Sequence, residues 1–148
     1  MPQSLANVLV HLIFSTKNRE PVIPHDLTSQ LHGYIVGILD NLGCPSIQTG
    51  GTRDHVHVLF LQSRTLAIAK VVEEVKKISS KWMKGQGVSA FTWQAGYAVF
   101  SVSESQKAAV VSYIQRQEAH HRRVGFQEEM REFLVRHGVS YDERYIWD

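Results

Sequence analysis

Cysteine is nearly absent from this sequence, since Cys44 is the single cysteine among 148 residues. A lone cysteine excludes a disulfide framework within the chain and a zinc site built from thiolates. The N-terminus lacks the charged-then-apolar order of a secretory signal peptide. No apolar run approaches the roughly 20 residues that a membrane-spanning helix requires. The composition therefore predicts a cytoplasmic protein that does not enter a membrane.

A strong charge of either sign is also lacking, because 16 basic and 14 acidic residues leave a formal net charge of +2. Apolar residues make up 43% and charged residues 20%, which is typical of a folded domain rather than a disordered chain. The acids are concentrated in residues 126–148, so the rest of the chain is net basic and weakly favours a polyanionic partner. The length predicts one domain spanning residues 1–148.

The hydrophobic pattern predicts strands and helices in the order β-α-β-β-α-β, followed by two further helices. The strands are expected near residues 8–14, 45–49, 55–62 and 91–102, and the helices near 26–41, 65–84, 104–121 and 126–136. This order matches the ferredoxin-like, or RRM-like, split βαβ pattern. The predicted fold class is therefore α+β, with additional C-terminal helices. Because that fold supports many unrelated activities, the function has to be argued from the side chains of a site.

Two histidines lie two positions apart in an otherwise apolar stretch, His55-Val56-His57. Side chains of a strand alternate between its two faces, so His55 and His57 share one face, about 6.6–7 Å apart along the chain. Two imidazoles on one rigid strand can bind a single metal ion from the same side. A pair of half-exposed surface histidines is the competing interpretation, and the motif alone does not decide between them.

A tyrosine and a glutamine lie four residues apart in the predicted helix 104–121, where Tyr113 and Gln117 would share one face. By itself this spacing favours an ordinary tyrosine whose ring packs while its hydroxyl meets water. Combined with the histidine pair, it supplies a third ligand and a nucleophile. The metal held by His55, His57 and Gln117 would act as a Lewis acid on a scissile phosphate. Tyr113 would attack phosphorus, and the ester formed would conserve the phosphodiester energy for rejoining.

The joint pattern resembles the HUH single-strand DNA transposases with one catalytic tyrosine, the insertion-sequence-200-like family. Besides His55-Val56-His57, three segments carry the resemblance. They are residues 10–19 (VHLIFSTKNR), 113–121 (YIQRQEAHH) and 141–147 (YDERYIW). The likeness runs through nearly the whole chain in the same order.

The resemblance implies an activity and partners that the composition does not show. Members of this family cleave and rejoin single-stranded DNA at hairpin-marked element ends, through a 5′-phosphotyrosine intermediate with a free 3′-hydroxyl. They use Mg²⁺ or Mn²⁺ and act as homodimers. In several members the tyrosine helix of one subunit completes the histidine site of the other. The prediction is therefore a metal-dependent DNA transposase with Tyr113 as its nucleophile, carried by the additional C-terminal helices.

Polar and basic side chains around the predicted catalytic residues are candidates for contacts with DNA. These candidates are Lys17, Asn18, Arg19, Arg53, Arg122 and Arg123. Those after the first strand are equally consistent with a solvated loop. The two arginines after the tyrosine helix could instead stabilise the end of that helix through its dipole. His11, on the first predicted strand, is expected in the core or behind a ligand rather than as a ligand.

Three other functions remain open on the sequence. A replication initiator or relaxase shares the two-histidine chemistry, but usually places its tyrosine differently and carries further domains. A non-catalytic RRM-like module would expose aromatic side chains on its central strands, where this sequence has paired histidines. A metal-dependent phosphodiesterase that uses water would not need Tyr113, so Tyr113→Phe distinguishes it from a transposase.

Overall fold

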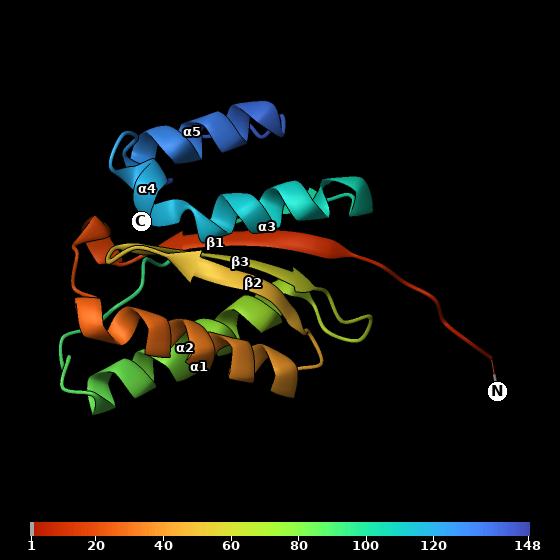
Figure 1. Ribbon diagram of the computed structural model, residues 1–148, viewed down its shortest axis with the longest axis horizontal. Coiled ribbons are helices and arrows are strands. Elements are labelled where there is room, and N and C mark those ends of the chain that lie inside the picture. The colour runs from red at the N-terminus through yellow and green to blue at the C-terminus, as the bar shows by residue number, and fades with distance from the viewer. Residues whose placement is uncertain (1) are drawn as a thin grey trace.

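A four-stranded antiparallel sheet lies between two layers of helices in the computed structural model, which describes residues 2–148 (Figure 1). The strands run in the spatial order β2-β3-β1-β4. They are β1 (Leu9–Ser15), β2 (Ser46–Gly51), β3 (His55–Leu61) and β4 (Ala98–Val102). The predicted α+β, ferredoxin-like class is confirmed.

The helices divide between the two faces of the sheet, as Figure 1 shows. The lower face in that view is covered by α1 (Thr28–Asn41) and α2 (Ile68–Gly85). The other face is covered by α3 (Lys107–Gln115), α4 (Gln117–His121) and α5 (Phe126–Arg136). Short 3-10 turns are η1 (Lys17–Arg19), η2 (His25–Leu27) and η3 (Glu104–Gln106).

The central strands β1 and β3 are buried on both faces, which explains why their sequences are apolar at nearly every position. One set of side chains packs in the main core with α1 and α2: Val10, Leu12, Phe14, Val56, Val58 and Phe60. The alternate set on the face toward α3–α5 includes His11, Ile13, Ser15, His55 and His57, all of them buried. Strand alternation therefore places both histidines of β3 beneath the C-terminal helices.

Helix α3 lies close to the sheet edge because β2 has a glycine at the point of contact. A Cβ atom added to Gly50 would lie 2.9 Å from both Cγ2 and the carbonyl oxygen of Ile114. Ile114 is 1% exposed, and it anchors α3 over a small apolar cluster with Leu9 and Leu59. Because Tyr113 directly precedes Ile114 in α3, this packing also positions the Tyr113 side chain.

The prediction of one continuous helix over 104–121 is wrong. The segment forms η3, α3 and α4, with a break at Arg116, whose φ of −100° and ψ of 19° are not helical. At the break the Arg116 N–H bonds to the Tyr113 carbonyl in a tight turn. The turn directs Gln117 into the protein, where its amide oxygen lies 3.0 Å from His55 Nε2 and its amide nitrogen donates to Glu129. The buried hydrogen bond to Glu129 partly compensates for the interrupted helix.

The prediction of a long strand over 91–102 is also wrong in extent. Only Ala98–Val102 forms a strand, preceded by an isolated bridge at Trp93. Between them the chain leaves the sheet, and the carbonyl groups of residues 94–96 accept hydrogen bonds from Lys76 Nζ at 2.9, 3.3 and 2.5 Å. A side chain from α2 thus replaces the ladder partners that a longer strand would have had.

The fold also shows the state of the single cysteine and the character of the helices. Cys44 is free and buried in the main core. Throughout residues 2–148, none of the helices has the length and apolar character needed to cross a bilayer.

Candidate active site

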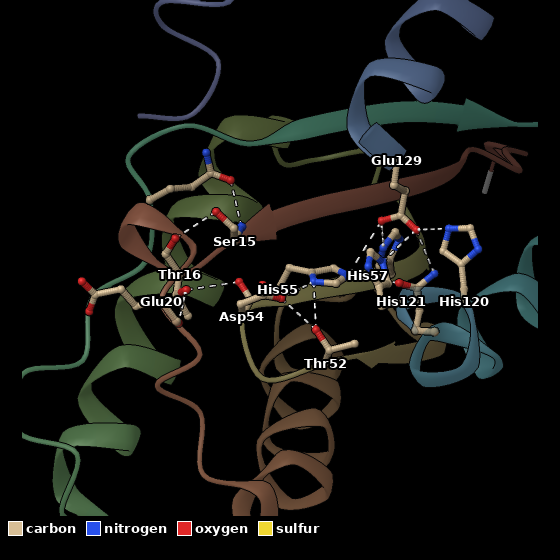
Figure 2. A network of polar contacts seen from close by, with 12 residues as sticks. Ser15, Thr16, Glu20, Thr52, Asp54, His55, His57, His120, His121 and Glu129 are labelled. Atoms are coloured by element: carbon tan, nitrogen blue, oxygen red, sulfur yellow. Dashed lines mark hydrogen bonds and ion pairs between the residues drawn. The ribbon is translucent and has the colours of Figure 1, made fainter. Parts of the chain in front are cut away.

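His55 and His57 form the floor of a buried polar cluster on the face of β3 beneath the C-terminal helices (Figure 2). Both residues are fully buried, and their ring centroids are 5.2 Å apart. The prediction that they share one face of a strand is confirmed. The competing interpretation of half-exposed surface histidines is wrong.

The structure brings Tyr113 and Gln117 to the same cluster. The Tyr113 ring centroid lies 5.7 Å from that of His57. Gln117 Oε1 lies 3.0 Å from His55 Nε2, and Gln117 is 1% exposed. The four residues predicted to form a site are therefore neighbours within one chain.

Glu129 of α5 lies at the centre of the cluster, and this residue was not predicted from the sequence. Its Oε1 atom lies 2.9 Å from His57 Nε2 and 3.8 Å from His55 Nε2. Its Oε2 atom accepts a short hydrogen bond from the Tyr113 hydroxyl and a weaker one, 3.3 Å long, from Gln117 Nε2. One carboxylate therefore contacts all four of the predicted residues.

Two histidines of α4 also reach Glu129, as Figure 2 shows. The Nε2 atoms of His120 and His121 each lie 3.1 Å from Glu129 Oε2. For His121 the geometry makes no hydrogen bond, so this buried nitrogen has no hydrogen-bond partner among residues 2–148. Donor atoms of His55, His57, His121 and Glu129 all lie within 4.8 Å of one another and could hold a metal ion.

The orientation of the His55 ring is set by hydrogen bonds on its far side. Its Nδ1 atom lies 2.7 Å from Asp54 Oδ1 and 3.0 Å from Thr52 Oγ1. Although burial opposes it, the hydrogen bond with His55 holds the pKa of Asp54 below its ordinary value. The ionised carboxylate accepts a hydrogen bond from Nδ1–H, and the tautomer that donates this bond has its lone pair on Nε2.

This tautomer leaves two hydrogen-bond acceptors facing each other. The lone pair of His55 Nε2 points toward Gln117 Oε1 at 3.0 Å. The amide orientation follows from Gln117 Nε2, which donates to Glu129. A cation beside the two acceptors, or a second proton on the ring, removes the repulsion. The nitrogen and oxygen donors present therefore fit a divalent metal.

His57 is supported from behind by His11, whose Nε2 atom lies 2.8 Å from His57 Nδ1. Burial, opposed in part by the Glu129 carboxylate, lowers the pKa of His57 to about 4. Burial and the nearby His57 also lower the pKa of His11 well below its ordinary value. Both rings are thus neutral at pH 7, and the neutral imidazole is the form that binds metals. His11 is buried, as expected from the sequence, and the structure places it behind His57.

The pKa values of Tyr113 and Glu129, at the centre of the cluster, are shifted in opposite directions. Burial and the neighbouring Glu129 carboxylate raise the pKa of Tyr113 well above its ordinary value. Burial opposes ionisation of Glu129, but the neighbouring imidazoles of His121 and His57 lower its pKa well below the usual range. The phenol is therefore protonated and the carboxylate ionised, so added positive charge is needed before Tyr113 becomes a strong nucleophile.

A family model described as Transposase IS200 like matches residues 4–117. The chain belongs to the IS200-like transposase family. The matched segment contains His55, His57, Tyr113 and Gln117, and it ends before Glu129. The family predicted from the sequence is confirmed.

Relatives of this IS200-like transposase agree with that assignment. The ISDra2 transposase TnpA of Deinococcus radiodurans is 27% identical over 114 residues, covering 72% of this chain and 81% of the relative. A crystal structure described as a transposase from Deinococcus radiodurans R1 superposes with a TM-score of 0.62, at 24% identity over 79% of this chain and 98% of that one. A REP-associated tyrosine transposase bound to a REP hairpin gives a TM-score of 0.58, at 16% identity over 82% and 72% of the two chains. Both structures share the fold.

Of the basic residues proposed to contact DNA in this IS200-like transposase, Arg53 and Arg122 lie beside the site. They line an open cleft of about 420 Å³ whose wall also includes Asp54 and His121. Arg123 is exposed directly after Arg122 in the chain. The cleft therefore leads from solvent toward the buried cluster.

The other three candidates lie in the 3-10 turn that follows β1. Lys17 and Asn18 are exposed, and Asn18 and Arg19 have φ values of 58° and 56°. The Arg19 guanidinium lies over the Trp147 ring, 5.4 Å from its centroid. The turn is tied to the site by Thr16, whose N–H donates to the Asp54 carbonyl at 2.8 Å. These side chains flank the site rather than line it.

One feature of the sequence does indicate Glu129. The segment 126–136 is amphipathic, and its buried stripe contains Phe126, Met130 and Leu134. Glu129 lies on that stripe, three residues after Phe126. An acid on the apolar face of a helix is expensive to bury unless it has partners, so its position indicated a polar site.

Proposed function

We propose that this IS200-like transposase cleaves and rejoins single-stranded DNA through a covalent bond between Tyr113 and a 5′-phosphate. The observation that carries the proposal is the contact of the Tyr113 hydroxyl with the buried His, Gln and Glu cluster. The relative that is bound to a REP hairpin supports a hairpin-marked DNA end as the substrate. Since the substrate is DNA, we assign the protein to the cytoplasm.

In this proposal His55, His57 and Gln117 hold Mg²⁺ or Mn²⁺. When bound, the metal would act as a Lewis acid that draws negative charge from the oxygens of the scissile phosphate. Asp54 and His11 keep the two imidazoles in the orientation that presents Nε2 to the cluster. Removal of the divalent ion with a chelator should therefore stop cleavage.

Tyr113 acts as the nucleophile. Its oxygen forms the new bond to phosphorus while the bond from phosphorus to the 3′ oxygen breaks, so a 3′-hydroxyl is released once that oxygen takes a proton. The phenolic proton leaves along the hydrogen bond already made to Glu129 Oε2. Rejoining is the reverse step, in which a 3′-hydroxyl attacks the phosphotyrosine.

The single strand would enter through the cleft lined by Arg53 and Arg122, whose charges neutralise phosphates. The turn with Lys17, Asn18 and Arg19, together with Arg123, would contact the flanking hairpin. The protein would act as a homodimer in which each chain holds a complete site.

Cleavage and binding assays on one hairpin oligonucleotide test this proposal. The oligonucleotide should carry the sequence that flanks the gene, and His57→Ala should abolish cleavage while hairpin binding stays nearly intact. Loss of both would place His57 in folding or DNA binding instead. Cleavage that survives when both His55 and His57 are replaced by Ala would exclude this site.

A further inference from the structure

We infer that Glu129 is a direct ligand of the metal, contributed through Oε1 by α5. The inference rests on the proposed function, because it concerns the metal that the histidines of β3 would hold. Glu129 lies beyond the segment that the family model matches, so the match does not assign it a role. The inference adds an anionic ligand to a set that otherwise consists of two imidazoles and an amide.

The two oxygens of Glu129 face different groups. Oε1 is directed at the histidine pair, 2.9 Å from His57 Nε2 and 3.8 Å from His55 Nε2. Oε2 is directed at Tyr113 and at the two histidines of α4. One oxygen is therefore free to bind a metal beside the imidazoles while the other keeps its contact with the nucleophile.

The size of the cluster fits a single ion. Two atoms that are each about 2.1 Å from one ion can be no more than about 4.2 Å apart. The donor atoms of Glu129, His55, His57 and His121 lie within 4.8 Å of one another. A contraction of a few tenths of an ångström, within the reach of side-chain rotations, would bring them around one ion.

The buried carboxylate of the cluster also favours a bound cation. Glu129 is 1% exposed, and in residues 2–148 its ion-pair partners are all histidines, with no lysine or arginine among them. A buried carboxylate without a cationic partner carries a large desolvation cost. A divalent ion would compensate that charge and would also supply the partner that His121 Nε2 lacks.

Metal binding would then connect three separate parts of the chain. His55 and His57 lie on β3, Gln117 begins α4, and Glu129 lies in the first turn of α5. Because carboxylate oxygens suit Mg²⁺ and Mn²⁺ better than imidazole nitrogens do, Glu129 would also bias the site toward these ions. The metal would hold α5 in place over the nucleophile.

Mn²⁺ titration followed by the electron paramagnetic resonance signal of the free ion tests the inference. Glu129→Gln keeps the shape of the side chain and removes its charge, and we expect it to weaken Mn²⁺ binding by at least about tenfold. Glu128→Gln makes the same charge change at an exposed position one residue away, and it should bind Mn²⁺ like the unaltered protein. Equal affinity of the two variants would overturn the inference and leave Glu129 as a hydrogen-bond acceptor only.

A second measurement uses the unaltered protein, so it does not depend on the folding of a variant. In crystals grown with Mn²⁺, anomalous scattering should place the ion within about 2.0–2.3 Å of a Glu129 oxygen. An ion held by His55 and His57 with both Glu129 oxygens farther away would overturn this inference alone. Absence of any ion at the histidines would overturn both the inference and the metal in the proposed function.

Discussion

On its Nδ1 side, the ring of His57 is held in position by a second imidazole, that of His11. The two side chains lie on neighbouring strands, where Ile13 pairs with His57, and their nitrogens are 2.8 Å apart. Groups behind a ligand fix its tautomer and orientation. His11 is therefore expected to act on the metal site without touching the metal.

Replacement of His11 should separate positioning from packing. His11→Leu fills the space without a hydrogen bond, and we expect Mn²⁺ affinity to fall by about 10–100-fold. His11→Gln can still hydrogen-bond to His57 and should recover part of that loss. Isothermal titration calorimetry with Mn²⁺ measures both variants. If the Leu variant bound Mn²⁺ as tightly as the unaltered protein, His11 would be a core residue only.

At this scale the sequence predicted which candidate residues come together better than it predicted their surroundings. His55 and His57 are visible as candidates because strand alternation is a local property. The contact of His57 with Glu129 joins residues 72 positions apart, so no spacing rule reveals it. Glu129 could be recognised only as an acid on an apolar helix face.

Among the elements, α3 depends on a glycine in the edge strand β2. A methyl group on Gly50 would lie 2.9 Å from atoms of Ile114, so α3 would have to move away from the sheet. We expect Gly50→Ala to lower the free energy of unfolding by about 1–3 kcal/mol, the usual cost of overpacking. It should also reduce cleavage, because Tyr113 moves with the helix.

Gly37→Ala is the matched control, because a Cβ at this exposed α1 position meets nothing within 4 Å. Alanine in a helix interior should instead stabilise the protein by about 0.5–1 kcal/mol. Urea unfolding of both variants gives the comparison. Similar effects of the two substitutions would show that α3 does not need the close approach at Gly50.

The elements that sequence periodicity misjudged are those whose limits depend on distant contacts. Helix 126–136 is predicted at its observed bounds because its pattern is local and flanked by Gly125. No glycine or proline marks the break at Arg116, which accompanies the buried contacts of Gln117 with His55 and Glu129. The strand predicted over 91–102 is reduced to β4 because Lys76 of α2 bonds to the carbonyl groups before it. Local propensity cannot indicate such a contact from a distant helix.

At the scale of the whole molecule, Tyr113 lies beside His57 of its own chain. The Tyr113 and His57 ring centroids are 5.7 Å apart, although the family resemblance implied that several members share sites between subunits. Mixing a Tyr113→Phe chain with a His57→Ala chain should therefore not restore cleavage. Heterodimers verified by differently tagged subunits provide the sample. Restored cleavage would show that α3 and α4 exchange between subunits on DNA.

The stability of the metal-free protein should depend on pH because a buried imidazole resists protonation. The pKa of His57 is about 4 in the folded protein, against an ordinary value near 6.5 in the unfolded chain. Between these values the unfolded state binds a proton that the folded state excludes, so stability falls as the pH falls from 6.5 to 4. His32, with a pKa of about 4 through burial and the nearby His55, acts in the same direction.

Urea unfolding in EDTA across this pH range measures the effect. The decrease in the free energy of unfolding that is assigned to His57 should approach roughly 3 kcal/mol at pH 4. His57→Gln should flatten the plot of unfolding free energy against pH. His25→Gln, which removes an exposed imidazole, is the control for the loss of a histidine. An equal slope in the unaltered protein and in His57→Gln would mean that His57 does not titrate below its ordinary pKa.

The central claim is that Tyr113 forms a covalent bond with DNA, and mapping the adduct tests it most directly. A hairpin oligonucleotide labelled at its 3′ end should transfer its label to the protein, because the 5′-phosphate created by the cut stays on the tyrosine. Mass spectrometry of the digested adduct should place the DNA on Tyr113 among the 5 tyrosines of the chain. Tyr113→Phe should bind the hairpin but form no adduct, whereas the exposed Tyr145→Phe should react normally. An adduct on another tyrosine, or cleavage by Tyr113→Phe, would contradict the account.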